Sequence, residues 1–158
     1  MPAADPRRII AALRDRGETL AVAESLTGGL LAATIVDVPG ASSVFRGGLV
    51  VYATDLKASL AGVPPALLAV HGPVHADVAA ALAGGARERC AADWGLATTG
   101  VAGPDPQDGI PVGTVHLGLV GPHGPAVVRT LALTGDRAAI RAASVHAALT
   151  LLGETLGR

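Results

Sequence analysis

The 158-residue sequence is poor in several residue types that common functions require. Its one cysteine, Cys90, excludes an intramolecular disulfide framework and a metal site built from several cysteines, and it suggests a reducing compartment. One tryptophan, one tyrosine and one phenylalanine are too few for a platform on which nucleic-acid bases stack. The formal net charge of -1 provides no basic surface. We therefore expect no direct contact with nucleic acid.

Long apolar runs are also missing, although half of the residues are hydrophobic. No such run reaches about 18 residues, the length that a membrane-spanning helix needs, and the first residues do not resemble a signal peptide. We expect a cytoplasmic protein without a membrane partner, folded as a single domain over residues 1–158. Its core must be aliphatic, and its many small side chains allow helices to pack closely on a sheet.

Lysine is as rare as the aromatic residues. Of the 12 basic residues only Lys57 is lysine, and the other 11 are arginine. Arginine cannot lose its proton near neutral pH, whereas a desolvated lysine can, and a neutral lysine can act as a general base or nucleophile. Lys57 is therefore a candidate catalytic residue, although a surface lysine retained by chance explains the composition equally well. The only tyrosine, Tyr52, lies five residues earlier, at the expected end of a strand, where a place on the sheet rim is equally plausible.

Apolar runs alternate with segments of helical periodicity along the whole chain. The runs predict strands at 20–23, 45–52, 94–98, 112–120 and 126–133. The periodic segments predict helices at 6–17, 30–38, 55–60, 66–70, 76–91 and 135–156. This alternation predicts an α/β fold, a three-layer α/β/α sandwich with a mostly parallel sheet. The expected hairpin at 112–133 adds antiparallel strands, so the sheet should be mixed.

Two loops stand at the carboxyl ends of predicted strands, where sheets of this kind bind ligands. The turn at 25–29 joins a strand to the start of a helix and contains Ser25, Thr27 and two glycines. The first amides of a helix lack partners and the glycines let a ligand approach the backbone, which favours an anion or oxyanion at this turn with Ser25 as nucleophile. Alternatively, the hydroxyl of Ser25 or Thr27 only caps the helix. The loop at 99–104 lacks the full P-loop and dinucleotide-binding patterns, so it is either a phosphate or sugar contact or a bare turn.

The histidines and two late arginines point less clearly to a site. His71 and His75 are four residues apart, but Gly72-Pro73 between them prevents a shared helical face, and no further zinc ligands can be placed. We therefore expect no metal site and no cofactor. Arg137 and Arg141 lie one helical turn apart and could clamp a phosphate, but surface ion pairs are the simpler interpretation.

Seven short segments occur in a fixed order between about residues 8 and 155. They are Ala23-Glu24-Ser25-Leu26-Thr27-Gly28-Gly29, Asp37-Val38-Pro39-Gly40-Ala41-Ser42, Tyr52-Ala53-Thr54-Asp55-Leu56-Lys57, His71-Gly72-Pro73-Val74, Thr99-Gly100-Val101-Ala102-Gly103-Pro104, Pro111-Val112-Gly113-Thr114-Val115 and Gly135-Asp136-Arg137. Together they closely resemble the CinA C-terminal domain family of nicotinamide-nucleotide amidases, also known as competence/damage-inducible proteins. Each segment alone is a weak signal, but seven in register are highly specific.

The resemblance implies hydrolysis of the carboxamide of nicotinamide mononucleotide to nicotinate mononucleotide and ammonia, in pyridine-nucleotide recycling and without a metal. It also implies a five-stranded mixed sheet, as in anticodon-binding domains, and a homodimer. The serine nucleophile of the family falls on Ser25, its lysine on Lys57 and its nearby tyrosine on Tyr52. With the 27–29 turn included, the positions expected to bind substrate are Thr27, Gly28, Gly29, Thr99, Gly100, Ala102, Gly103, Arg137 and Arg141.

The sequence departs from the family pattern at three positions. Leu26 replaces a common cysteine, Thr54 replaces the usual asparagine, and His75 stands where serine is frequent. None of these removes the expected catalytic residues, so they bear on substrate contacts rather than on the reaction.

The implied mechanism agrees with the chemistry of the residues. Neutral Lys57 would take the proton of Ser25, which attacks the carboxamide while amides of the 26–29 turn hold the oxyanion, and water then hydrolyses the acyl-enzyme. The 5′-phosphate would bind to Thr and Gly amides or to the two late arginines. Two alternatives are a nucleotide-binding or regulatory module without turnover, linked to competence or DNA damage, and a Ser-Lys amidase for another small amide.

Overall fold

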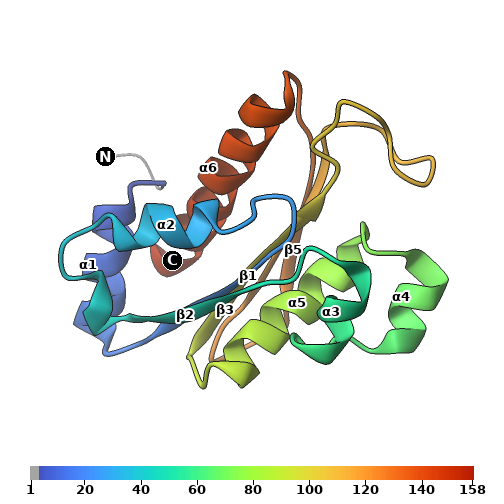
Figure 1. Ribbon diagram of the computed structural model, residues 1–158. Helices are drawn as coiled ribbons and strands as arrows, with labels where there is room; N and C mark the ends of the chain where they lie inside the picture. Colours follow the sequence, from blue (N-terminus) through green and yellow to red (C-terminus); the bar gives the residue numbers. More distant parts are fainter. Residues whose placement is uncertain (1–3) are drawn as a thin grey trace.

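The computed structural model describes residues 4–158, in which a twisted sheet lies between two layers of helices (Figure 1). The strands are β1 (Leu20–Glu24), β2 (Phe45–Val50), β3 (Trp94–Gly100), β4 (Thr114–Val120) and β5 (Val127–Ala132). Within the described residues they form one five-stranded sheet in the order β2-β1-β3-β4-β5. β2 and β3 pair in parallel with β1, and the two remaining pairings are antiparallel. The predicted mixed sheet is thus confirmed, with β4 running against its neighbours.

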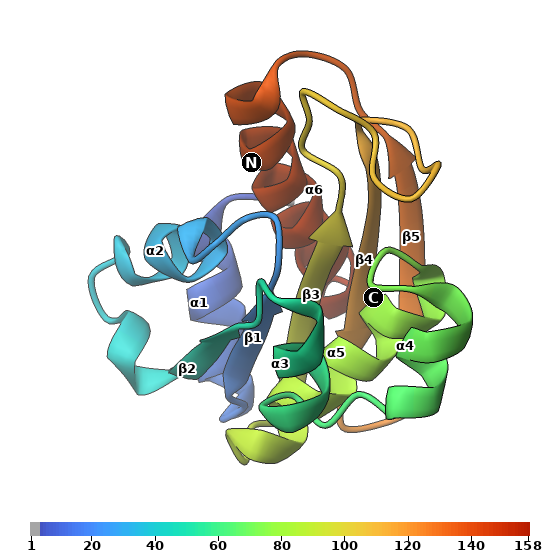
Figure 2. The same ribbon diagram turned by 45° about the vertical axis from the view of Figure 1, so that its right-hand side comes forward.

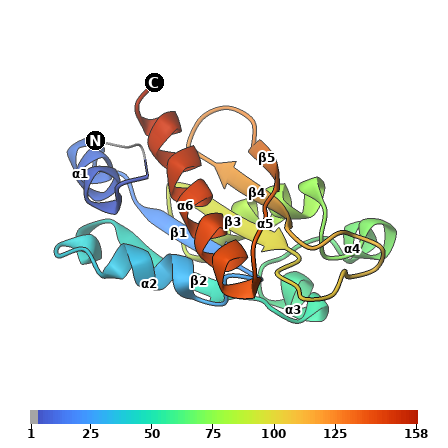
Figure 3. The same cartoon turned by 90° about the horizontal axis from the view of Figure 1, so that it is seen from above.

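Helices cover both faces of the sheet, as the two rotated views show (Figures 2 and 3). One layer contains α1 (Pro6–Arg16), α2 (Leu30–Val36) and α6 (Arg137–Leu156). The other contains α3 (Thr54–Ser59), α4 (Pro65–His71) and α5 (Ala76–Arg89). A short 3₁₀ helix, η1 (Ala41–Ser43), was not expected from the sequence. Among the described helices, none combines the length and the apolar character needed to cross a bilayer.

The ends of the two long outer helices follow from local sequence. Asp5 accepts a hydrogen bond from the Arg7 amide at 2.9 Å to begin α1, and Gly17 ends this helix with a φ of 66°. Asp136 caps α6 in the same way, through the Ala139 amide at 2.9 Å. Both helices were predicted from their apolar periodicity, and the aspartate caps explain why they begin where they do.

The two faces of the sheet carry side chains of different size. Along β1, Leu20 and Val22 pack with the α1–α2–α6 layer, whereas Ala21 and Ala23 pack on the α5 side. On that second side a Cβ atom added at Gly95 would lie 1.9 Å from the Ala83 carbonyl oxygen of α5. α5 therefore lies so close to β3 that only glycine fits at position 95, as expected from the abundance of small residues.

The parallel part of the sheet determines where a site can form. Because β1, β2 and β3 run in the same direction, their carboxyl ends meet at one edge of the sheet. The chain leaves this edge at Ser25, Val51 and Val101. The first and the third lie in the two loops that the sequence marked as candidates, whereas residue 51 was expected to belong to the strand.

Two adjacent glycines of α5 offer a matched test of the close packing. A Cβ atom at Gly85 would lie 1.8 Å from the Ala61 carbonyl oxygen, whereas one at Gly84 would meet nothing within 4 Å. Gly85→Ala should lower the free energy of unfolding by about 1–3 kcal/mol, because the helix must shift. Gly84→Ala should raise it by roughly 0.5–1 kcal/mol through helix propensity. Urea denaturation measures both, and equal midpoints for the two variants would contradict the packing described.

Candidate active site

The loops at the carboxyl ends of the parallel strands enclose a pocket of about 320 Å³, a volume suited to a small molecule. The residues that line it are Ser25, Leu26, Tyr52, Ala53, Thr54, Lys57, Pro73, Val74, Gly100, Val101, Ala102, Gly103, Asp105 and Gln107. The three residues expected to be catalytic are therefore all part of one pocket.

Ser25 and Lys57 contact each other at the base of this pocket. Lys57 Nζ lies 3.0 Å from Ser25 Oγ, 2.7 Å from the Val51 carbonyl oxygen and 3.2 Å from the Tyr52 carbonyl oxygen. The lysine is 1% exposed and the serine 8% exposed, so bulk water has little access to either group. The structure thus brings together two residues that lie 32 positions apart in the sequence.

The three contacts of the amine define how a proton can move. A neutral amine has two hydrogens and one lone pair, and the two carbonyl oxygens can each accept one of those hydrogens. The lone pair then remains for the third neighbour, the hydroxyl of Ser25. An amine held in this way is oriented to accept the serine proton.

Burial lowers the pKa of Lys57 from 10.5 to about 8, because the charged amine is poorly solvated in this position. Within residues 4–158 the recorded ion pairs do not include Lys57. Its contacts are the Ser25 hydroxyl and two carbonyl oxygens, all uncharged, and the carbonyl oxygens accept hydrogen bonds from the charged and the neutral amine alike. A substantial neutral fraction is therefore present at mildly alkaline pH.

A buried carboxylate fixes the turn that carries Ser25. Glu24 is fully buried, and its two carboxylate oxygens accept hydrogen bonds from the Leu31 and Ala32 amides at 2.8 and 3.0 Å. These amides belong to the first turn of α2, whose N-cap residue, Gly29, makes no side-chain cap. The alternative that Ser25 or Thr27 caps this helix is therefore wrong, since Glu24 satisfies the amides instead. The available signal was a charged residue at the end of an otherwise apolar strand.

Some backbone amides of the same turn have no hydrogen-bond acceptor among residues 4–158. The Gly28 amide donates to the Ser25 carbonyl oxygen at 3.0 Å, and the Leu30 amide donates to Thr27 at the same distance. In the described part of the chain the amides of Leu26, Thr27 and Gly29 have no hydrogen-bond acceptor. The expected oxyanion donors of the 26–29 turn are thus narrowed to these three groups, and Leu26 is the one of the three residues that lines the pocket.

Arg141 holds this turn from the other side. Its Nε and Nη2 atoms donate to the Leu26 and Thr27 carbonyl oxygens, each at 2.9 Å. Arg141 belongs to α6, a helix that begins more than 100 residues after the turn in the sequence. This helix therefore helps to hold the turn in its orientation. In this structure Arg141 lies outside the residues that line the pocket, and a phosphate contact for it stays a prediction.

Arg137 connects three separate parts of the site. It donates to the Gly103 carbonyl oxygen at 2.5 Å and to the Tyr52 hydroxyl at 3.1 Å. The Tyr52 side chain is 61% exposed at the rim of the pocket, and its backbone carbonyl, rather than its hydroxyl, contacts Lys57. Any influence of this tyrosine on the lysine is therefore exerted through the backbone.

The remaining predicted residues divide into two groups. Gly100, Ala102 and Gly103 line the pocket, as expected for substrate contacts. The others have internal contacts or lie away from the lining: Thr27 Oγ1 is 2.8 Å from Thr98 Oγ1, and Thr99 Oγ1 donates to the Pro73 carbonyl oxygen at 2.6 Å. Gly28 and Gly29 shape the turn through positive φ angles of 57° and 101°.

Several lining residues were not predicted from the sequence. Asp105 and Gln107 belong to a segment between two predicted strands to which the sequence assigned no role, yet they form part of the pocket wall. Pro73 and Val74 form another part of it from the turn before α5. The only available signal was that Gln107 is the sole glutamine in the chain.

Known proteins share both the sequence and the fold of this chain. It is 55% identical over 148 residues to a CinA-like protein of Frankia casuarinae, a match that covers 94% of this chain and 34% of that protein. It is 50% identical over 150 residues to a CinA-like protein of Anaeromyxobacter sp. (strain Fw109-5), covering 93% of this chain and 36% of that protein. The chain thus spans about a third of the length of the curated relatives it matches.

Solved structures agree with this relationship. A competence/damage inducible protein from Agrobacterium tumefaciens superposes with a TM-score of 0.92 at 35% identity, covering 97% of this chain and 93% of that one. A CinA superfamily protein from Klebsiella pneumoniae gives a TM-score of 0.93 at 31% identity, covering 99% of both chains. The family model described as the CinA C-terminal domain matches residues 4–156, and the chain therefore belongs to the CinA C-terminal domain family.

Proposed function

We propose that this chain is a nicotinamide-nucleotide amidase that converts nicotinamide mononucleotide to nicotinate mononucleotide and ammonia. The observation that carries the proposal is the buried amine of Lys57, 3.0 Å from the hydroxyl of Ser25 at the base of a small-molecule pocket. An amide is a poor electrophile, so its hydrolysis requires an activated nucleophile and a stabilised oxyanion. The choice of this particular amide comes from the resemblance to the family.

In the first half-reaction, neutral Lys57 takes the proton of Ser25 while Ser25 Oγ bonds to the carboxamide carbon. The carbonyl π electrons move to oxygen, where unpaired amides of the 26–29 turn, first of all that of the pocket-lining Leu26, can donate hydrogen bonds. The Lys57 ammonium then gives its proton to the leaving nitrogen, the C–N bond breaks, and ammonia departs. A serine ester of the pyridine carboxyl group remains.

In the second half-reaction, water attacks the ester carbon with Lys57 again as the base. The bond between the carbon and Ser25 Oγ breaks, the serine regains its proton from Lys57, and the carboxylic acid product leaves. The two carbonyl oxygens that contact the amine keep it in place through both steps. The dry environment strengthens each of these contacts.

The phosphate end of the substrate calls for a cation near the mouth of the pocket. Arg137 carries five N–H donors and uses two of its nitrogen atoms for Gly103 and Tyr52, so donors remain for a phosphate without loss of either contact. Arg141 likewise uses two of its nitrogen atoms, and neither arginine is among the residues that line the pocket. Arg137 is the better candidate because both of its partners, Gly103 and Tyr52, line the pocket, whereas Arg141 is engaged with the serine turn.

Removing either catalytic group should abolish turnover while leaving substrate binding. We expect Ser25→Ala and Lys57→Met each to lower kcat by about 10³-fold or more, since both the nucleophile and its base are required. Ammonia release from nicotinamide mononucleotide measures kcat, and circular dichroism checks the fold. The exposed Ser42→Ala is the matched serine control and should retain full activity. Near-normal ammonia release by folded Ser25→Ala would refute the mechanism.

The same assay separates the alternatives. Binding of nicotinamide mononucleotide without ammonia release from the unmodified chain would favour a nucleotide-binding module. If another small amide in a substrate panel gave a higher kcat/KM than nicotinamide mononucleotide, the Ser-Lys mechanism would stand and that amide would be the favoured substrate.

Activity should depend on pH through the amine. Because the base must be neutral and the pKa of Lys57 is lowered to about 8, kcat/KM should rise with pH and level off above that value. Below about pH 7 it should fall tenfold for each pH unit. The lowered pKa also means that the folded chain binds fewer protons than the unfolded chain between about pH 8 and 10.5, so the Lys57 contribution to stability increases over that interval. A flat rate profile from pH 6 to 9 would contradict this assignment.

The tyrosine hydroxyl should contribute little to proton transfer, because it contacts Arg137 instead of Lys57. Tyr52→Phe should lower kcat/KM by less than about tenfold and leave the midpoint of the pH profile unchanged. A shift of that midpoint in steady-state measurements would show that the hydroxyl tunes the lysine.

A further inference from the structure

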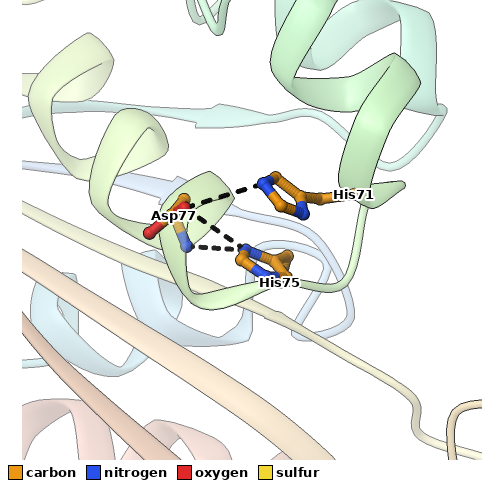
Figure 4. A group of neighbouring side chains, drawn as sticks. All are labelled: His71, His75 and Asp77. Carbon is orange, nitrogen blue, oxygen red and sulfur yellow. Dashed lines mark hydrogen bonds and ion pairs between the residues drawn. The ribbon is translucent and has the colours of Figure 1, made fainter.

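Two histidines and an aspartate meet at the turn that joins α4 to α5, as Figure 4 shows. His71 is the last residue of α4, His75 immediately precedes α5, and Asp77 lies in the first turn of α5. One donor atom from each residue lies within 4.8 Å of the other two. His71 Nε2 and His75 Nδ1 are each 3.8 Å from Asp77 Oδ2, and the two imidazole rings stack with centroids 3.8 Å apart.

This arrangement differs from what the sequence led us to expect. Gly72-Pro73 does prevent His71 and His75 from sharing a helix, but Gly72 adopts a φ of 71° and the chain reverses there. The reversal places one ring on the other, and the start of α5 adds the carboxylate that could not be placed from the sequence. Two residues that cannot share a helical face can thus still meet across the turn between two helices.

We propose that His71, His75 and Asp77 form a binding site for one divalent transition-metal ion of the zinc class. Two imidazoles and a carboxylate are a ligand set that zinc accepts, with water in the remaining position. Tetrahedral bonds of about 2.0–2.2 Å place ligand atoms about 3.4 Å apart. The two His–Asp separations of 3.8 Å exceed this value by about 0.4 Å. The two imidazoles must also rotate out of their stacked arrangement to direct both lone pairs at one ion, so binding requires a side-chain movement. The side chains are 33%, 36% and 64% exposed, so they have room to make it.

The hydrogen bonding of His75 already suits a metal ligand. Its Nδ1 atom accepts the Asp77 amide at 3.1 Å, which requires an unprotonated nitrogen directed toward the aspartate. An ion at the centre of the cluster would take the same lone pair. The displaced amide lies at an exposed helix start, where water can replace the nitrogen as acceptor.

The position of the cluster indicates a structural role for the ion. The three ligands are not among the residues that line the candidate pocket, but Pro73 and Val74, which lie between the histidines, are. Thr99 also donates to the Pro73 carbonyl oxygen at 2.6 Å from the end of β3. A bound ion would thus tie α4 to α5 behind one wall of the pocket without contacting substrate. The metal site does not depend on the proposed amidase activity.

Titration of the full chain with zinc tests the proposal. The protein should carry no polyhistidine tag and be freed of metal with EDTA before calorimetry. We expect one zinc ion per chain, a higher melting temperature with zinc, and visible absorption typical of a low-coordinate site when Co²⁺ replaces zinc. His71→Gln, His75→Asn and Asp77→Asn should each weaken zinc binding by about tenfold or more.

Two variants separate metal binding from folding. His75→Asn provides a side chain that can still cap α5, so its melting temperature in EDTA should match that of the unmodified chain. His123→Gln removes an exposed histidine outside the cluster and should leave zinc affinity unchanged. The proposal is overturned if the unmodified chain binds no zinc at 100 µM protein, if all three ligand variants keep its affinity, or if His123→Gln loses affinity to the same degree.

Discussion

The arrangement of the candidate site depends on one buried amine and the groups that make its burial tolerable. An isolated ammonium in the protein interior is strongly disfavoured, and a lysine in such a position needs either a carboxylate or a set of polar acceptors. Here the acceptors are the Val51 and Tyr52 carbonyl oxygens, which lie just beyond the last residue of β2. Because the strand has ended, these oxygens are free to turn toward α3, the helix that carries Lys57. Carbonyl acceptors hold the amine without fixing its charge, whereas a carboxylate would favour the protonated form.

Around this amine, two ionic side chains hold the backbone of the serine turn from opposite ends. Glu24 accepts from amides of α2, and Arg141 donates to carbonyl oxygens of the turn. Neither side chain needs to reach the substrate for this purpose. Their combined effect is to hold the unpaired amides of the turn, those of Leu26, Thr27 and Gly29, at fixed positions near the nucleophile. Donors fixed before the reaction stabilise a developing oxyanion without a cost of reorganisation at that moment.

Apart from the short helix η1, the elements of this fold were predictable because each has a local signal: an apolar run for a strand, or helical periodicity for a helix. The end of β3 shows the limit of local signals. The strand was expected to end at residue 98 and runs to Gly100, because Thr99 and Gly100 pair with His116 and Val115 of β4. The meeting of Ser25 with Lys57 was anticipated only through the family resemblance. Contacts made over long separations, such as Arg137 with Tyr52 and Arg141 with Leu26, have no local signature in a single sequence.

The position of the pocket wall follows from the close packing on the α5 side of the sheet. A Cβ atom at Gly118 would lie 2.1 Å from the Ala79 carbonyl oxygen, so α5 rests on β4 with no side chain between them at this point. The turn before α5, with Pro73 and Val74, is consequently held near the end of β3, where Thr99 reaches the Pro73 carbonyl oxygen. Larger residues beneath α5 would lift the helix and with it this wall. The small side chains of the core therefore serve the shape of the site as well as the packing of the fold, because an aliphatic core of ordinary size would hold α5 farther from the sheet.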